Sequence, residues 1–243
     1  MVYQNDRPLA LVTGAGVRLG RAIADALAEK GYALGVHYHR SQDGAEELAA
    51  QITQKGGQAY PLPADLTEPD QIADLFQRVA ALPHRLKVLV NSAAVMPHGR
   101  LRETSVADWD ATLDLNLRAP WLCACHAAGL MGEGGVIVNL SDAGTVKAWT
   151  GYPTYLVSKA GVEMLTRLLA SDLAPAIRVN AVAPGLILPS EDTPPETWER
   201  LVDRLPLKQP GTPEAIAQAV IFLIENSYVT GQTLVVDGGY QLK

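Results

Sequence analysis

The sequence predicts an α/β protein in which a doubly wound parallel sheet lies between two layers of helices. Short apolar runs of strand length alternate with helical patterns along nearly the whole chain, an order typical of a parallel sheet with right-handed crossovers. A glycine-rich segment separates the first apolar run from the first helical pattern. The chain has 243 residues and contains no linker, internal repeat or low-complexity tract, so we expect a single domain over residues 1–243. This is a Rossmann-type three-layer sandwich.

In the first half of the chain, four apolar runs alternate with three helical patterns. The expected strands are residues 8–13, residues 32–38, a short run that leads into Pro61, and residues 87–91. The expected helices are residues 21–30, residues 43–55 and residues 69–82. The first of them shows the required periodicity, because Ile23, Ala24, Leu27 and Ala28 recur at helical spacing. The third has a proline at an early helical position, where no backbone N–H is needed.

The second half continues the alternation and adds one helix that no strand follows directly. The expected helices are residues 105–131, residues 153–173, a proline-flanked insert at residues 191–205, and residues 213–225. The expected strands are residues 135–141, residues 177–182 and residues 233–236. These runs are rich in valine, isoleucine and leucine without polar alternation, which is typical of strands that are buried on both faces.

Tyr155 and Lys159 are the first candidate catalytic pair. They lie four residues apart within the expected helix at residues 153–173, so their side chains leave the same helix face one turn apart. An ammonium group near a phenol favours the phenolate, and we therefore expect Lys159 to lower the pKa of Tyr155 toward working pH. Tyr155 could then act as a general acid or base.

The glycine-rich segment predicts a dinucleotide site. It reads TGAGVRLG from Thr13 to Gly20 and leads directly into a helix. Glycines let the backbone approach a pyrophosphate, which the free N–H groups and the dipole at a helix N-terminus attract. Strand, turn and helix occur in the order that this motif requires, although an ordinary glycine-rich turn is the alternative. The predicted cofactor-binding residues of the segment are Gly14, Arg18, Leu19 and Gly20.

The end of the second strand selects the cofactor. A carboxylate there would bind a 2′-hydroxyl and favour NAD, whereas an arginine accommodates the 2′-phosphate of NADP. Arg40 can bind a phosphate through two parallel hydrogen bonds, so we predict NADP(H). The alternative is that Arg40 only pairs with Glu46 or Glu47 on the surface. The predicted binding segment, which has no acidic residue, is His37, Tyr38, His39, Arg40 and Ser41.

Two further strand ends are predicted to reach the cofactor. Asp65 and Leu66 follow the third strand and are placed to contact the adenine end. Asn91, Ser92 and Ala93 follow the fourth strand and approach the ribose side. Taken singly these predictions are weaker, because an aspartate before a helix is often only a cap.

Composition and charge exclude several other functions. The formal net charge is −6, the isoelectric point is near 5.4 and no basic run occurs, so we expect no nucleic-acid partner. We find no signal segment and no apolar run of membrane-spanning length, and we expect a cytoplasmic protein without a membrane partner. The only cysteines, Cys123 and Cys125, would point to nearly opposite sides of a helix. We expect both to be buried and inert, and we expect no bound metal.

Together these motifs resemble those of the short-chain dehydrogenase/reductase family, and the resemblance covers essentially the whole chain. The matching motifs are the TGAGVRLG segment, Asp65, Asn91 to Ala93, Asn116, Tyr155-x-x-x-Lys159, Arg178-Val-Asn180, Pro184-Gly185, and the segment from Thr230 to Gly239. The resemblance implies that Tyr155 donates a proton, that Lys159 binds the nicotinamide ribose, and that Asn116 supports a water-linked proton path. It also implies cofactor contacts at Pro184, Gly185 and Leu186.

Two departures from the general family pattern are shared with its pteridine reductase branch, which this chain resembles most. Arg18 stands where the family usually has the second glycine of its phosphate loop. Asp142 stands where the family usually has a serine that hydrogen-bonds a substrate carbonyl. Ser141 is adjacent, but its side chain should point to the other side of the strand end. The branch also shares His37 to Ser41, Gly151-Tyr152-x-x-Tyr155, Pro184-Gly-Leu186, Pro194-Pro195-x-x-Trp198-Glu199, and Asp237-Gly-Gly-Tyr240.

The chemistry of a pterin agrees with these two substitutions. Its reducible bond is C=N, so a nitrogen needs a proton as the carbon receives hydride. A carboxyl group at Asp142, beside Tyr155, could help to supply that proton if its pKa is raised. Arg18 would place a cation between the cofactor phosphate and the oxo group of the bound ring. The alternative is that Asp142 only caps the following loop and that Arg18 binds only pyrophosphate.

One position departs from the branch. By alignment Met96 stands where pteridine reductases carry an aromatic residue that stacks on the pterin, and a methionine has less geometric preference for a ring face. Tyr152, Trp149 and Trp198 are possible walls of the substrate site or ordinary packing residues. The predicted substrate-binding residues are Arg18, Met96, Asp142, Tyr152 and Tyr155.

The sequence thus supports an NADPH-dependent reductase of a pterin or dihydropteridine, with dihydrofolate as a further candidate substrate. A carbonyl reductase of the same family, acting on a ketone or 3-oxoacyl group, is the alternative enzyme. A non-catalytic NADP sensor is the third possibility. The predicted catalytic residues are Asp142, Tyr155, Lys159 and Asn116. The family resemblance also implies a homotetramer, with contacts through the helix at residues 213–225 and the final strand.

Overall fold

The computed structural model describes residues 7–190 and 193–243, and it confirms the predicted fold. Seven strands form one sheet in the order β3-β2-β1-β4-β5-β6-β7, and every neighbouring pair is parallel. The order reverses between β1 and β4, the kind of point at which ligands bind in open α/β sheets. The strands are β1 (Leu9–Val12), β2 (Ala33–Tyr38), β3 (Ala59–Pro63), β4 (Leu86–Asn91), β5 (Gly135–Leu140), β6 (Ile177–Pro184) and β7 (Thr233–Val236).

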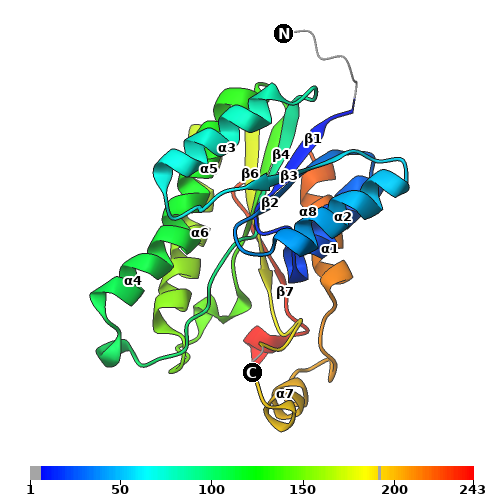
Figure 1. The fold of residues 1–243 in the computed structure, drawn as a ribbon. Helices are drawn as coiled ribbons and strands as arrows, with labels where there is room; N and C mark the ends of the chain where they lie inside the picture. The colour runs from blue at the N-terminus through cyan, green and yellow to red at the C-terminus, as the bar shows by residue number, and fades with distance from the viewer. Residues whose placement is uncertain (1–6, 191–192) are drawn as a thin grey trace.

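Two helical layers cover the sheet (Figure 1). One face carries α1 (Arg18–Glu29), α2 (Gln42–Gln54) and α8 (Pro213–Glu225), and the other carries α3 (Pro69–Ala81), α5 (Ala119–Met131) and α6 (Pro153–Asp172). Each layer encloses its own apolar core, built mostly from valine, leucine, isoleucine and alanine. Because the strands are parallel, their carboxyl ends meet at one edge, and α4 (Val106–Leu113) and α7 (Pro195–Val202) lie toward that edge.

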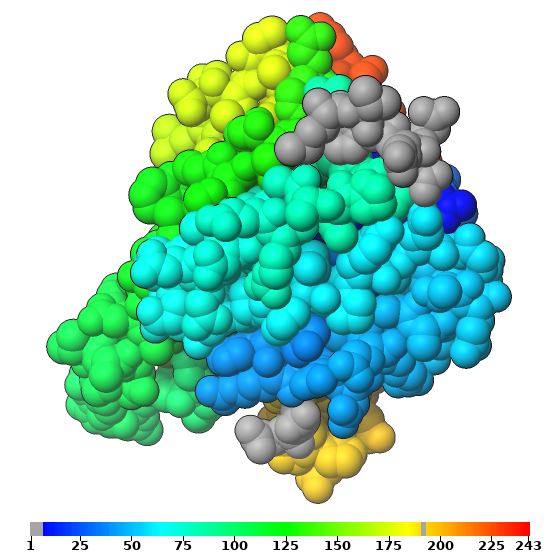
Figure 2. Space-filling model, turned by 45° about the horizontal axis from the view of Figure 1, so that its top comes forward, coloured from blue at the N-terminus to red at the C-terminus, as the bar shows by residue number. Residues whose placement is uncertain are grey.

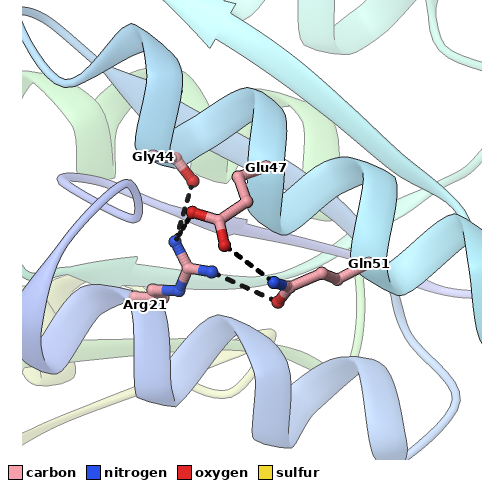
Figure 3. A network of polar contacts seen from close by, with 4 residues as sticks. All are labelled: Arg21, Gly44, Glu47 and Gln51. Atoms are coloured by element: carbon pink, nitrogen blue, oxygen red, sulfur yellow. Dashed lines mark hydrogen bonds and ion pairs between the residues drawn. The ribbon is translucent and has the colours of Figure 1, made fainter.

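A polar network fixes α2 against α1, as Figure 3 shows. The Arg21 guanidinium donates to the Gly44 carbonyl and pairs with Glu47, both at 3.2 Å, and it also donates to Gln51 at 3.2 Å. A Cβ on Gly44 would lie only 2.4 Å from the carbonyl oxygen of Gly16, so the start of α2 touches the glycine-rich turn directly. Because β2 leads into α2, the network also keeps the end of β2 beside the glycine-rich turn.

The expected helix at residues 105–131 is divided by a π-helical turn, Asp114–Arg118, between α4 and α5. The wider turn contains Asn116, which is buried at 1% exposure. Such insertions are often found at functional sites. Cys123 is buried as expected, and burial raises the pKa of its thiol to about 12. The prediction that Cys125 is buried is wrong, because it lies on the exposed side of α5.

The predicted helical insert is shorter than expected. Its helix, α7, spans Pro195–Val202, and residues 191 and 192 of the expected segment lie outside the described residues. Three short 3₁₀ turns were not predicted: η1 (Leu101–Glu103), η3 (Ala143–Val146) and η4 (Tyr240–Leu242). Figure 2 shows α7, in gold, as a projection at the lower edge of the molecule.

Within residues 7–190 and 193–243, no helix has both the length and the hydropathy that a membrane-spanning helix needs.

Candidate active site

Tyr155 and Asp142 meet at the carboxyl end of β5. Tyr155 lies in the first turn of α6, and its hydroxyl donates to Asp142 Oδ2 at 2.8 Å. The other carboxyl oxygen, Oδ1, accepts from the Gly144 N–H at 2.7 Å and so caps η3. One carboxyl oxygen therefore orders the loop and the other faces Tyr155, so the loop cap and the contact with Tyr155 occur in the same side chain.

Ser141 points away from this pair, as its register predicted. Its hydroxyl donates to Glu163 Oε1 at 2.8 Å, and the Thr145 hydroxyl donates to the same oxygen at 2.8 Å. Glu163 lies one helical turn beyond Lys159 on α6. It thereby holds the residues on either side of Asp142 against this helix.

Lys159 lies beneath Tyr155 with 4% of its surface exposed. Its ammonium donates to the Leu140 carbonyl at 2.7 Å and lies 5.7 Å from the centroid of the Tyr155 ring. Burial lowers the pKa of Lys159 to about 8, against the opposing effect of the Asp142 charge. At neutral pH the lysine is charged, because its pKa still lies above that range.

The prediction that the pKa of Tyr155 is lowered is wrong. Burial raises its pKa well above 10, and the negative charge and hydrogen bond of Asp142 raise it further. Lys159 does not outweigh these effects, because its ammonium is directed to the Leu140 carbonyl rather than to the phenol oxygen. Tyr155 is therefore a phenol that keeps its proton until a stronger base develops beside it.

The pKa of Asp142 is raised as well. Burial is the main cause and the Glu163 carboxylate adds to it, whereas the bonds from Gly144 and Tyr155 and the charge of Lys159 oppose the shift. A carboxyl group with a raised pKa keeps a proton at higher pH than an exposed aspartate does. Asp142 is therefore suited to hold a proton next to Tyr155.

Asn116 reaches the site from the π-helical turn. Its Oδ1 accepts from Val95 N at 2.9 Å, and its Nδ2 donates to Val95 O at 2.8 Å and to Ser158 Oγ at 3.0 Å. These bonds occupy the amide on both sides. Asn116 thus fixes the backbone immediately before Met96, and its place in a water-linked proton path stays a prediction.

The glycine-rich turn has the geometry of an anion site. Gly14 has φ +67°, and a Cβ there would come within 3.0 Å of Ala93 Cα. A Cβ on Gly20 would lie 2.2 Å from the Gly14 carbonyl oxygen, so only glycine permits this approach of α1. Leu19 packs partly against the adjoining core, and the amino end of α1 faces the carboxyl edge of the sheet. Free N–H groups at such a helix end attract phosphate.

Arg18 adopts a left-handed conformation with φ +51° at the first position of α1. For a residue with a Cβ this conformation costs about 1–2 kcal/mol. Its guanidinium is exposed and donates to the carbonyls of Leu188 at 3.3 Å and Pro189 at 3.0 Å. The guanidinium thus contacts the loop after β6, and the predicted contacts of Arg18 with a cofactor phosphate and a substrate stay a prediction.

His37 and Tyr38 lie beneath the nucleotide end rather than on it. His37 Nδ1 accepts from Gly14 N at 3.1 Å, and Nε2 lies 3.1 Å from the Ala64 carbonyl oxygen, so both ring nitrogens are engaged. Burial lowers the pKa of His37 to about 4, which keeps the ring neutral. Tyr38 is buried in the core. The His37 side chain therefore positions Gly14 and the Tyr38 side chain packs in the core, while cofactor contacts at these two residues stay a prediction.

His39, Arg40 and Ser41 are accessible at the end of β2. His39 Nε2 lies 3.6 Å from Asp65 Oδ2. Within the described part of the chain, Arg40 forms no ion pair with Glu46 or Glu47, which bond instead to Gln42 and to Arg21 and Gln51. The surface-pair alternative for Arg40 is therefore not what the structure shows, and its guanidinium can meet a 2′-phosphate.

Replacement of Arg40 with aspartate is expected to reverse the cofactor preference. Loss of a charge-assisted phosphate contact and introduction of a like charge should weaken NADPH binding by a factor of about 10–100, whereas NADH binding should stay the same or improve. Titration of both cofactors by fluorescence measures the ratio. Arg204→Asp, on the segment after α7, makes the same charge change as a control. An unchanged preference for NADPH would contradict the assignment.

The remaining predicted strand-end residues are mostly held by the protein itself. Asp65 Oδ1 accepts from Thr67 N and Oγ1 at 2.9 and 2.7 Å, and Leu66 is buried under α3. The Asn91 amide donates to Asn139 Oδ1 at 2.8 Å within the sheet. The side chains of Leu66 and Asn91 face the interior, and cofactor contacts at these two residues stay a prediction.

The backbone at these positions still borders the site. The N–H groups of Ser92 and Ala93 donate to Thr13 Oγ1 at 2.9 and 3.1 Å, which joins β4 to the glycine-rich turn. At the end of β6, after Pro184, Gly185 N donates to Val236 O at 2.9 Å, and Leu186 O accepts from Gly211 N at 2.9 Å. These bonds fix the backbone of the loops at the carboxyl edge of the sheet.

Met96 and Tyr152 lie on two loops that contact each other. Gly99 N donates to Gly151 O at 2.9 Å and joins the loops. Met96 is 39% exposed. The Tyr152 ring makes edge contacts with His98, at 5.3 Å between centroids, and with Trp149, at 6.1 Å. Aromatic rings therefore occur beside the site even though the stacking position holds methionine. His98 was missed, because no sequence spacing relates it to residue 152.

The chain is similar to known reductases over nearly its whole length. A family model described as enoyl-(acyl carrier protein) reductase matches residues 14–241. The chain is 36% identical over 250 residues to 1-cyclohexenylcarbonyl-CoA reductase of Streptomyces collinus, covering 97% of this chain and 88% of that protein. It is 34% identical over 237 residues to 3-oxoacyl-[acyl-carrier-protein] reductase FabG of Staphylococcus epidermidis, covering 95% and 97%.

A solved structure extends the comparison to the bound cofactor. The crystal structure of FolM alternative dihydrofolate reductase 1 from Brucella canis, complexed with NADP, superposes with a TM-score of 0.93 at 33% identity. The match covers 100% of this chain and 96% of that one. The similar proteins thus include reductases named for thioester-linked substrates and one named for dihydrofolate.

Proposed function

The chain belongs to the short-chain dehydrogenase/reductase family and is an NADP-dependent reductase, and from this premise we propose that it reduces a pterin or dihydropteridine, with dihydrofolate in the same substrate class. The observation that carries the proposal is the 2.8 Å hydrogen bond from the Tyr155 hydroxyl to the Asp142 carboxyl. A carboxyl with a raised pKa in this place can supply a proton to a developing nitrogen anion.

The residues of the nucleotide end fit NADP(H). Gly14 and Gly20 allow close approach of a pyrophosphate to the amino end of α1, and Arg40 is accessible for a 2′-phosphate. Lys159 presents a buried cation on the same side of α6 as Tyr155. When bound there, the reduced nicotinamide supplies the hydride that is added to the carbon of the substrate C=N bond.

Tyr155 delivers the accompanying proton. Because its pKa is raised, the phenol is intact at neutral pH and gives up its proton only as negative charge develops on the substrate nitrogen. The carboxyl of Asp142, in its protonated form, then returns a proton to the phenolate oxygen across the 2.8 Å bond and regains one from solvent. One hydride and one proton are added in total, which balances reduction of one C=N bond.

Reduction of a ketone or 3-oxoacyl group is the second candidate, favoured by the name of the similar 3-oxoacyl-[acyl-carrier-protein] reductase and by Met96 in place of a stacking ring. Such a substrate has a carbonyl oxygen that needs a hydrogen-bond donor. Asp142 in its ionised form can only accept a hydrogen bond, and it already accepts one from the Tyr155 hydroxyl. The position therefore supports the pteridine proposal over the carbonyl one.

Substrate choice is tested by NADPH oxidation at 340 nm with dihydrobiopterin, dihydromonapterin and dihydrofolate beside a panel of ketones. The proposal predicts turnover with at least one pteridine and kcat/KM values for the ketones that are lower by a factor of about 10 or more, the discrimination that one mismatched polar group provides. Turnover with ketones alone would overturn it. Binding of NADPH without turnover of either class would favour a sensor.

We also propose that the chain forms a homotetramer, which stays an inference from the family. Two apolar residues of the proposed contact region are exposed, Phe222 of α8 at 48% and Val235 of β7 at 40%. Pairing these elements with a second copy would cover them. A light-scattering mass of one subunit would refute the proposal.

The cytoplasmic location likewise stays a prediction from the sequence.

A further inference from the structure

The C-terminal turn η4 packs against the loop that follows β5. Lys147 of this loop donates to the carbonyls of Tyr240 at 2.6 Å and Lys243 at 2.5 Å, and its ammonium lies 3.7 Å from the centroid of the Tyr240 ring. Gln241 Nε2 donates to Ala143 O at 2.9 Å. The end of the chain is therefore tied to both sides of η3, the turn that Asp142 caps.

Trp149 connects Tyr240 to the Asp142 carboxyl. Its indole N–H donates to the Tyr240 hydroxyl, and the two rings meet edge-on with centroids 5.8 Å apart. On the other side the indole covers Gly144, where a Cβ would lie 2.6 Å from Trp149 Cζ2 and 2.9 Å from Asp142 Oδ1. Gly144 is thus enclosed between the indole and the carboxyl oxygen that its own N–H holds at 2.7 Å.

We propose that Tyr240 is a positioning residue for the proton path: by accepting the Trp149 hydrogen bond it holds the indole against Gly144 and so keeps the Asp142 carboxyl directed at Tyr155. This inference rests on the proposed function of Asp142 as the proton source for Tyr155. Tyr240 does not itself touch the Tyr155 hydroxyl, so it acts through Trp149 and Gly144. Tyr240 thereby acquires a function in proton transfer that its position near the surface would not suggest by itself.

The groups around Asp142 determine how its pKa would change if the contact between Tyr240 and Trp149 were loosened. From α6 it is faced by Tyr155, Lys159 and Glu163, and from η4 by the uncharged phenol of Tyr240, whose pKa burial raises. Lys159 and Glu163 oppose each other, so burial decides the direction of the Asp142 shift. If the loop moves outward, water reaches the carboxyl and its pKa falls toward the ordinary value for aspartate.

The test replaces Tyr240 with phenylalanine, which keeps the ring over Lys147 and removes only the hydroxyl. We expect kcat to fall about fivefold, the factor that corresponds to a hydrogen bond of about 1 kcal/mol, with little change in KM or in NADPH affinity. The falling limb of the pH profile should move to lower pH. Tyr228→Phe is the matched control, because Tyr228 is fully exposed. It should behave as the wild type.

A double-mutant cycle tests whether the effect passes through Trp149. Trp149→Phe removes the indole donor, so it should lower kcat to a similar extent, and the variant that carries both changes should lose no more than either alone. If the two losses in kcat multiply in the double variant, the effect of Tyr240 does not pass through Trp149. A Tyr240→Phe enzyme with wild-type kcat and pH profile would overturn the proposal altogether.

A second measurement needs no substrate. The carboxyl carbon of Asp142 is followed by ¹³C NMR of aspartate-labelled enzyme and is assigned from the signal that Asp142→Asn removes. The midpoint should move to lower pH in Tyr240→Phe and stay in place in Tyr228→Phe; an unmoved midpoint in Tyr240→Phe contradicts the proposal. If the enzyme reduces ketones rather than pteridines, this titration and kinetics with the ketone still test the function of Tyr240.

Discussion

Tyr155→Phe is expected to lower kcat by a factor of about 10²–10⁴, the contribution typical of a positioned general acid. The phenyl ring fills the same space in α6, but it cannot deliver a proton to the substrate or receive one from Asp142 across the 2.8 Å contact. NADPH affinity should be nearly unchanged, because the glycine-rich turn and Arg40 lie on other elements. Stopped-flow measurement of NADPH oxidation, together with fluorescence titration of the cofactor, separates the two effects.

Tyr228→Phe serves as the control here as well, and it should retain full activity because its side chain is exposed and far from β5 in the chain. The Tyr155→Phe protein must also bind NADPH, which shows that it is folded. Activity above about one tenth of wild type in such a protein would show that the proton comes from another group.

Asp142→Asn is expected to lower kcat by a factor of about 10 or more and to simplify the pH profile. The amide has the same shape and can still accept from Gly144 N, so the loop is preserved, but it cannot release a proton. In the wild type, kcat/KM should decline as pH rises through the raised pKa of Asp142, since the protonated carboxyl is the active form. That limb should be absent from the variant.

The pH profile of Asp142→Asn should keep a second limb, which belongs to Lys159, and this limb should shift in pH. Burial lowers the pKa of Lys159 to about 8, and the negative charge of Asp142 opposes that shift. Removal of the carboxylate therefore lowers the pKa of Lys159 further, and the limb that belongs to the lysine should appear at lower pH in Asp142→Asn. A variant profile that still declines in two steps would show that Asp142 is not the titrating group.

Asp142→Ser restores the residue usual for the family and provides the comparison in substrate choice. Its hydroxyl can donate to a carbonyl oxygen, so ketone reduction should rise while pteridine reduction falls. Unchanged pteridine reduction would show that the carboxyl takes no part in the proton path.

The architecture of this protein follows closely from local patterns. Apolar runs such as residues 177–182 predict strands because a buried parallel strand needs no polar alternation. The proximity of Tyr155 to Asp142 could also be predicted, because the carboxyl end of β5 and the first turn of α6 are adjacent along the family fold. Alternation of strands and helices was sufficient to predict a parallel sheet between two layers of helices.

The ionisation of the site could not be predicted in the same way. The four-residue spacing of Tyr155 and Lys159 suggested a lowered phenol pKa, but the structure directs the ammonium to the Leu140 carbonyl and buries the phenol against a carboxyl. His37 likewise lies in the expected segment, but its ring turns inward to Gly14. Burial and the direction of a side chain depend on the whole fold, whereas spacing gives only the helix face.

By itself, the sequence determined the strand and helix order, the glycine-rich turn, the arginine at the end of the second strand, and the carboxyl at residue 142. These depend on short-range periodicity and on residue chemistry. Only the tertiary structure decided that Tyr155 keeps its proton, that Asn116 lies in a π-helical turn, and that Tyr240 reaches back over Trp149 toward Asp142. These depend on contacts between residues as many as 98 positions apart, the separation of Gln241 from Ala143. A linear pattern does not encode such contacts, because packing of the complete core sets them.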